Sequence, residues 1–202
     1  MRALIYDAAI LPLTTKWYAE VLDRVPRGAH LLDVGIGTGG ALARNADVVR
    51  EKDLHVVGVD IDPDYVQRAK NSMRNAGLDD RVEVLLESIT EHRGGPYDAV
   101  YFSASFMLMP DPPSVLAHVI TLLAPDGHVY FTQTFQDKRS KVMERAKPLL
   151  GKVTTIEFGR VTYEEDFRRT VELGGLALND LVTMDRSGGR SYRLAIGVPK
   201  GA

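Results

Sequence analysis

Short runs of apolar residues alternate along this chain with longer segments in which apolar residues recur every three or four positions. Runs of the first kind are typical of buried strands, and segments of the second kind are typical of helices. The first strand-like run opens the stretch of residues 30–40. The others are residues 55–60, 81–86, 97–102 and 128–132. Because helical segments separate these runs, we expect βαβ units and a parallel sheet.

Start and stop signals place helices between these strands. Asp62 is suited to cap a helix, Pro63 fits the first helical position, and Gly77 follows the expected end. Thr162 and Glu165 have the spacing of a capping box and predict another helix. Further helices are expected from Thr14 or Thr15 to about residue 25, after residue 40 to about 51, after 111 to before 125, and over 138–147.

The last third of the chain differs in pattern. Residues 153–158 predict a short strand or an extended lid, and residues 176–184 and 192–198 predict two more strands. The connection over 185–191 is too short for a crossover, so these two strands are expected to pair antiparallel. We therefore predict an α/β fold with a three-layer, doubly wound sheet of seven strands, mostly parallel, with a C-terminal antiparallel pair.

Composition narrows the class of protein. The 202 residues are enough for one sizeable core, and a net charge of −2 with no basic block does not favour nucleic acid as a partner. The absence of cysteine excludes disulfides, thiolate zinc sites and cysteine nucleophiles, and it favours a cytoplasmic location. No apolar run approaches the ~20 residues of a membrane span, so stable membrane insertion is not expected.

The first strand-like run leads into a cluster of four glycines and then a helix start. Gly35 and Gly37 allow positive φ and a close approach of the backbone to a ligand. We expect the turn to present free N–H groups to an electron-rich ligand. Gly35, Gly37 and Gly40 fit a dinucleotide-binding turn. In contrast, Gly35, Gly37 and Gly39, preceded by Asp33, resemble the first motif of class I S-adenosylmethionine-dependent methyltransferases.

Two acids help to choose between these ligands. Asp60 ends the second strand-like run, where a carboxylate can accept hydrogen bonds from both hydroxyls of a ribose, and this suits an adenosine ligand of either kind. Asp33 lies two residues before the first glycine, and a buried carboxylate needs a partner. It would repel a pyrophosphate but would face the positively charged amino end of S-adenosylmethionine. Asp33 therefore favours the sulfonium cofactor over NAD.

Motifs spread over most of the chain extend this resemblance. In order, they are LLDVGIGTG at 31–39, VGVDID at 57–62, YDAV at 97–100, MPD at 109–111 and LAPDGHV at 123–129. The chain is similar to the small class I methyltransferases of the type-11 or ubiquinone-pathway kind, which have a Rossmann-like fold. The resemblance implies one methyltransferase domain over 1–202, with an N-terminal cap helix at 1–27, a cofactor-binding core at 28–135, and C-terminal helices and the antiparallel strand pair at 136–202.

The resemblance also implies which residues hold the cofactor, S-adenosylmethionine. They are Asp33, Gly35, Gly37 and Gly39 for the amino-acid half, Asp60 for the ribose, Ile61, Glu87, Ser88 and Ile89 for the adenine, and Ser103 near the methionine portion. Members of the family often have Asp at the position of Glu87. Because Glu is one methylene longer, Ser88 or a backbone N–H is an alternative contact for the exocyclic amine of adenine.

The methyl acceptor and any catalytic base are less defined. The walls of a small-molecule acceptor pocket are expected from residues 1–25 and 136–162, and the apolar stretch before Pro110 is either core packing or a further part of that pocket. The candidate residues are Tyr6, Trp17, Tyr18 and Met107. Relatives often carry a histidine in that stretch, whereas this chain offers none. Asp7, Tyr6 and Glu157 are candidates for a base by location only, so no catalytic residue is assigned. The five histidines lack metal-ligand spacing, and no metal is expected.

We therefore expect methyl transfer from S-adenosylmethionine to a small molecule by in-line displacement, in which the enzyme mainly aligns the reacting groups. Two alternatives stay open. An NAD(P)-dependent oxidoreductase would share the glycine turn, but the chain lacks a Tyr-x-x-x-Lys pair. A non-catalytic cofactor-binding or interaction protein would need no base.

Overall fold

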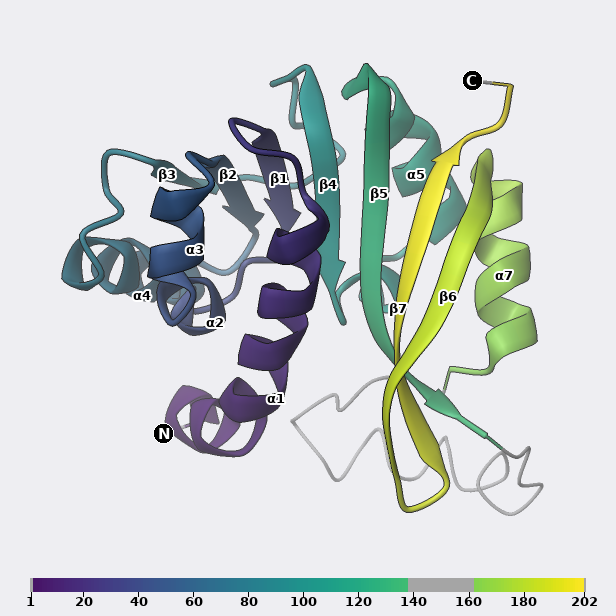
Figure 1. Ribbon diagram of the computed structural model, residues 1–202, viewed down its shortest axis with the longest axis horizontal. Coiled ribbons are helices and arrows are strands. Elements are labelled where there is room, and N and C mark those ends of the chain that lie inside the picture. The colour runs from purple at the N-terminus through teal and green to yellow at the C-terminus, as the bar shows by residue number, and fades with distance from the viewer. Residues whose placement is uncertain (1, 138–161, 202) are drawn as a thin grey trace.

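Seven strands form one sheet in the order β3-β2-β1-β4-β5-β7-β6 (Figure 1). The computed structural model describes residues 2–137 and 162–201 of the chain, and the side chains of residues 11–137 and 162–201. The strands are β1 (His30–Val34), β2 (His55–Asp60), β3 (Val82–Leu86), β4 (Tyr97–Ser103), β5 (Leu123–Gln136), β6 (Leu176–Ser187) and β7 (Arg190–Pro199). Strands β1 to β5 pair in parallel, and β7 runs antiparallel between β5 and β6. The predicted fold class is confirmed.

Helices cover both faces of this sheet and make three layers (Figure 1). One face carries α1 (Arg2–Arg24), α2 (Gly40–Ala43), α3 (Ala46–Glu51) and α4 (Pro63–Asn75). The other carries the 3-10 helix η1 (Phe106–Leu108), α5 (Pro112–Ile120) and α7 (Glu164–Leu173). Since successive strand residues point to opposite faces, Leu31 packs in the first layer and Leu32 in the second. Both leucines are fully buried, and each contributes about 1.5–3 kcal/mol.

Several local predictions are confirmed. Strand β2 has the predicted bounds, and the Asp62 carboxylate caps α4 by accepting hydrogen bonds from the N–H groups of Asp64 and Tyr65. The predicted antiparallel pair is formed by β6 and β7, with Ser187 opposite Arg190 at the turn. These features were predictable because short-range residue patterns determine them.

Two predicted helices differ from the structure. Helix α1 continues through Pro12 to Arg2 instead of beginning at Thr14 or Thr15, because both threonine hydroxyls donate to the carbonyl of Leu11 within the helix. The single helix expected up to residue 51 is two helices. Asn45 interrupts it, since its side-chain amide donates to the carbonyls of Thr15 (3.1 Å) and Ala41 (2.8 Å).

Two further predictions need correction. The strand expected over 128–132 begins earlier, at Leu123, and residues 125–127 lie inside β5 as an irregularity between the pairs Tyr97–Leu123 and Ala99–His128. The predicted capping box is wrong. Thr162 forms a bridge with Phe135, and α7 begins at Glu164, with no side-chain cap at its start. The helix predicted over 138–147 and the strand or lid predicted over 153–158 lie outside the described residues.

Candidate functional site

The order of the strands identifies one edge of the sheet as the candidate site. Strand β1 lies between β2 and β4, and the chain leaves β1 toward α2 on one face and β4 toward α5 on the other. In open parallel sheets, ligands bind where connections diverge in this way, beyond the carboxyl ends of the strands. Almost all of the predicted cofactor residues follow or end β1, β2, β3 and β4, so the fold brings them to this edge.

The glycine turn after β1 is tightly built. Gly35, Gly37 and Gly39 all have positive φ, at 78°, 59° and 68°. A Cβ on Gly35 would lie 2.9 Å from the Cβ of Ser105, whereas a Cβ on Gly37 would meet nothing within 4 Å. The backbone at Gly37 therefore faces open space, and its conformation alone requires glycine.

The N–H groups of this turn are largely used within the protein. Those of Gly35 and Ile36 donate to the carbonyl of Val59, and that of Gly39 donates to the carbonyl of Ile36. The N–H of Gly37 donates to Oδ2 of Asp60 at 2.9 Å. The expectation that the turn presents free N–H groups is therefore wrong for these four positions. A pyrophosphate is bound by free backbone N–H groups, so this turn does not suit a dinucleotide.

Asp33 is fully buried on the α1 face of β1. Its Oδ2 accepts a hydrogen bond from the Tyr18 hydroxyl at 2.8 Å, while its Oδ1 is buried without a hydrogen-bond partner among the residues whose side chains are described. Burial raises the pKa of Asp33 to about 7; the Tyr18 hydrogen bond opposes this shift and the charge of Asp60 adds to it. An unpaired buried oxygen of this kind suits a positively charged group in the adjoining turn.

Asp60 ends β2 and holds the glycine turn. In addition to the N–H of Gly37, its Oδ1 accepts the N–H of Asp62 at 3.0 Å. Each carboxylate oxygen has two acceptor positions, so the predicted ribose contact is compatible with these bonds.

Two exposed apolar side chains lie beside Asp60. Ile61 follows it and is 75% exposed, and Leu86 of the neighbouring strand, which pairs with Asp60, is 57% exposed. Together they offer apolar surface for one ring system. Leu86 was not predicted as a site residue; its place as the last apolar residue before Glu87 is the signal that could have indicated it.

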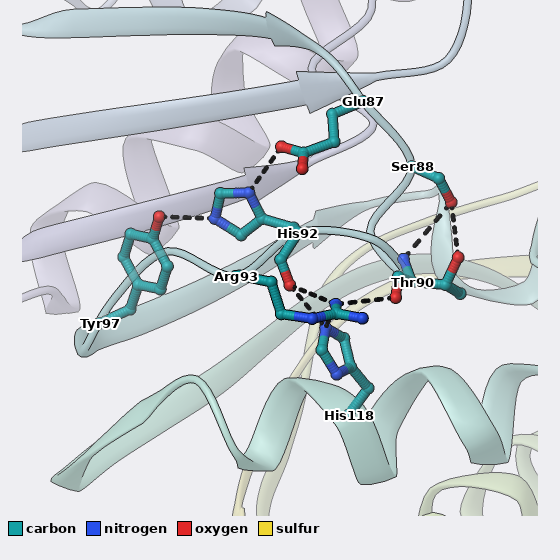
Figure 2. Close-up of polar contacts among 7 residues, drawn as sticks. All are labelled: Glu87, Ser88, Thr90, His92, Arg93, Tyr97 and His118. Carbon is teal, nitrogen blue, oxygen red and sulfur yellow. Dashed lines mark hydrogen bonds and ion pairs between the residues drawn. The ribbon is translucent and has the colours of Figure 1, made fainter.

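In the segment after β3, Figure 2 shows Glu87 pointing toward His92 and His92 pointing toward Tyr97. Oε2 of Glu87 lies 2.9 Å from Nδ1 of His92, and Nε2 of His92 lies 2.8 Å from the Tyr97 hydroxyl. Burial, followed by the charges of Glu83 and Glu87, raises the pKa of Tyr97 to about 12. Tyr97 thus keeps its proton. In the tautomer of His92 that carries its proton on Nδ1, Nε2 accepts a hydrogen bond from the Tyr97 hydroxyl, and Nδ1 donates one to Glu87.

The other predicted residues of this segment have local partners. Ser88 Oγ lies 2.9 Å from the Thr90 hydroxyl and accepts the N–H of Thr90 (Figure 2). The Ile89 side chain is buried in the second core layer instead of lining the edge. Ser103 ends β4, where it pairs with Thr132 of β5. Ser105, which was not predicted, donates to the carbonyl of Val34 at 2.5 Å and covers Gly35.

The predicted acceptor residues are mostly buried. Trp17 and Tyr18 are 4% and 3% exposed, and the Trp17 ring lies 6.1 Å from that of Tyr192. Met107 is half-buried in η1 and packs against the second core layer. The side chain of Tyr6 lies outside the described residues, as does Glu157.

Other features of the described residues lie away from this edge. One surface hollow lies beside His30 and His55 at the amino ends of β1 and β2, and another lies beside Arg93 and His118. Within the described part of the chain, no three His, Asp or Glu side chains are grouped to hold a metal ion. No helix in that part is long and apolar enough to span a bilayer.

The seven-stranded sheet with its antiparallel end and the glycine turn flanked by two acids define the class I methyltransferase arrangement. A family model described as "Methyltransferase domain" matches residues 26–174. The chain therefore belongs to this family, among the class I S-adenosylmethionine-dependent methyltransferases.

Individual relatives are similar to the chain in sequence, and solved structures are similar to it in fold. The chain is 29% identical to the ubiquinone biosynthesis O-methyltransferase of Acinetobacter baumannii over 133 residues, which are 65% of this chain and 54% of that protein, so the match spans about half of the relative's length. A SAM-dependent methyltransferase from Aquifex aeolicus has a TM-score of 0.67 at 20% identity, with 89% of each chain covered. Geranyl diphosphate C-methyltransferase from Streptomyces coelicolor has a TM-score of 0.70 at 13% identity, with 93% and 79% covered.

Proposed function

We propose that this chain transfers the methyl group of S-adenosylmethionine to a small-molecule acceptor by in-line displacement. One observation carries the proposal: the turn after β1 uses the N–H groups of Gly35 and Gly37 internally and lies next to a buried carboxyl, Asp33, with one unpaired oxygen. Such a site favours a cationic ligand over a pyrophosphate. Family membership over residues 26–174 supports the same cofactor.

The residues of the edge have separate tasks in this proposal. Asp33 pairs with the ammonium group of the cofactor, beside the turn formed by Gly35, Gly37 and Gly39. Asp60 accepts the ribose hydroxyls. When bound, the cofactor supplies a methyl group on a sulfonium with a good leaving group.

The adenine half of the cofactor lies against the apolar side chains of the edge. Ile61 and Leu86 flank the ring, and their exposure of 75% and 57% supports this assignment. Because Oε2 of Glu87 is engaged by His92, an adenine contact from Glu87 falls to Oε1. Contacts from Ser88, Ile89 and Ser103 stay predictions.

The acceptor is proposed to approach from the side of α1 and η1, where Trp17 and Met107 lie. The main task of these elements is to hold the acceptor in line with the methyl group, and alignment alone can contribute up to ~7–11 kcal/mol. A relative named ubiquinone biosynthesis O-methyltransferase makes a hydroxyl acceptor the first class to test. A hydroxyl would need a base, which an amine or thiolate would not.

A methyl-transfer screen tests the proposal. S-adenosylmethionine labelled in its methyl group is offered with phenols, amines, thiols and lipid head groups, and label is expected in one class. Asp60→Ala should abolish most transfer. Asp98→Ala is the matched control, because Asp98 is an acid at the opposite end of the sheet, where it accepts the N–H of His30. No transfer to any class by a chain that binds S-adenosylhomocysteine would favour a non-catalytic binding protein.

The proposal treats residues 1–202 as one methyltransferase domain, and the single seven-stranded sheet supports this. A cytoplasmic location stays a prediction from the sequence.

A further inference from the structure

The two oxygens of Asp33 have different surroundings. Oδ2 accepts the Tyr18 hydroxyl at 2.8 Å, whereas Oδ1 is buried without a partner among the residues whose side chains are described. Tyr18 comes from α1 and is itself 3% exposed, and its ring packs edge-on against Tyr101 at 4.9 Å. The hydroxyl of Tyr18 is therefore held at one fixed place over β1.

Within the described part of the chain, the groups that face Asp33 supply no positive charge. They are Tyr18 from α1, Asp60 from β2 and Tyr101 from β4. Among residues 11–137 and 162–201, no Lys, Arg or His forms an ion pair with Asp33. Tyr101 keeps its proton, because burial raises its pKa above the value of an ordinary tyrosine. Among the residues whose side chains are described, the hydroxyl of Tyr18 is the group that stabilises an ionised Asp33 directly.

We propose that Tyr18 is a positioning residue for the methyl donor: its hydrogen bond fixes Oδ2 of Asp33, leaves Oδ1 for the donor's ammonium group, and couples helix α1 to donor binding. The inference rests on the proposed function. It also gives Tyr18 a task on the cofactor side of the edge, in place of the acceptor wall expected from the sequence.

Proton balance follows from the same geometry. Burial raises the pKa of Asp33 to about 7, so part of the protein carries a proton there near neutral pH. The ammonium group of the donor binds the ionised carboxylate, and the proton of Asp33 passes to solvent. Tyr18 donates its hydrogen bond throughout and keeps its own proton. We call the pH at which half of the protein has Asp33 ionised the midpoint. Below this midpoint, the affinity for the donor should fall, because protons compete with the donor for Asp33.

The test measures the affinity of S-adenosylhomocysteine by calorimetry between pH 5.5 and 8 for the native chain and Tyr18→Phe. The Phe variant keeps the ring and loses only the hydroxyl. Because one charge-assisted hydrogen bond is lost, the midpoint should move upward by about one pH unit, and affinity at pH 7 should fall about fivefold. A purely structural role for Tyr18 would leave the midpoint in place.

Two controls show whether a midpoint shift in Tyr18→Phe comes from the lost hydrogen bond to Asp33. Tyr101→Phe removes a buried hydroxyl that bonds Thr132 at 2.8 Å and not Asp33, so its midpoint should match that of the native chain. In an Asp33→Asn background, Tyr18→Phe should produce no midpoint shift.

The outcomes distinguish this inference from the proposed function. Binding of S-adenosylhomocysteine by the native chain with an unchanged midpoint in Tyr18→Phe overturns the inference and leaves the function standing. An equal shift in Tyr101→Phe also overturns it. No binding by the native chain at any pH overturns both.

Discussion

Replacing Asp33 with Asn should change how the stability of the protein depends on pH. In the unfolded chain, Asp33 loses its proton near its ordinary pKa of 3.8; in the folded chain, burial holds the proton up to about pH 7. Between these values the unfolded chain binds fewer protons than the folded one. The contribution of Asp33 to the free energy of unfolding is therefore fully present below about pH 4. It decreases as the pH rises to about 7 and does not change further above that pH.

The size of this effect follows from the shift. A rise from 3.8 to about 7 is roughly three pKa units, and at about 1.4 kcal/mol per unit it corresponds to about 4 kcal/mol as an upper limit. The Asn side-chain oxygen can still accept the Tyr18 hydroxyl. Its amide donors are new and partly unpaired, which costs about 1–3 kcal/mol, but this cost does not depend on pH.

Urea unfolding of the native chain and Asp33→Asn at intervals from pH 4 to 8.5 measures the difference directly. The variant should gain up to about 4 kcal/mol relative to the native chain between pH 4 and 7, with no further gain above. Leu32→Ala is the control, because Leu32 is the next residue, is equally buried and does not titrate. It should cost about 2–5 kcal/mol at every pH. A pH-independent difference for Asp33→Asn would refute the account of this carboxyl.

Further substitutions at the edge have distinct expected effects. Asp60→Ala should weaken S-adenosylhomocysteine binding by about tenfold or more in calorimetry, since it removes a charged acceptor; unchanged affinity in a folded variant would remove Asp60 from the site. Gly35→Ala should lower the melting temperature and weaken binding, because the new Cβ would lie 2.9 Å from that of Ser105 at a positive φ; native values for both would contradict the tight packing of the turn. His92→Phe should alter the affinity for adenosine analogues changed at the exocyclic amine, because it frees the Glu87 carboxylate; equal discrimination by variant and native chain would separate Glu87 from the adenine.

The predictions that held depend on short-range pattern. The strand at 55–60 and the Asp62 cap could be predicted because a few adjacent residues determine each of them. The placement of Asp33 and Asp60 at one edge followed from parallel pairing. Sequence alone was therefore enough to expect these two candidate residues at the same edge of the sheet.

Contacts between distant residues were not predictable from the sequence. N–H groups of the glycine turn donate to Val59 and Asp60 of the next strand. They are therefore not free to bind an anion, although the glycines alone indicated an anion site. Likewise, nothing local to Tyr18 indicates that its hydroxyl reaches Asp33 across the core. Asn45 interrupts a helix through a bond to Thr15, which lies on another helix.

The most direct test of the central claim is calorimetric titration of the native chain with S-adenosylhomocysteine and, separately, with NADH at pH 8, where Asp33 is largely ionised. One S-adenosylhomocysteine should bind per chain, NADH should give no heat of binding, and Asp60→Ala should weaken the first titration. Binding of NADH without binding of S-adenosylhomocysteine would contradict the claim that this edge holds a cationic methyl donor.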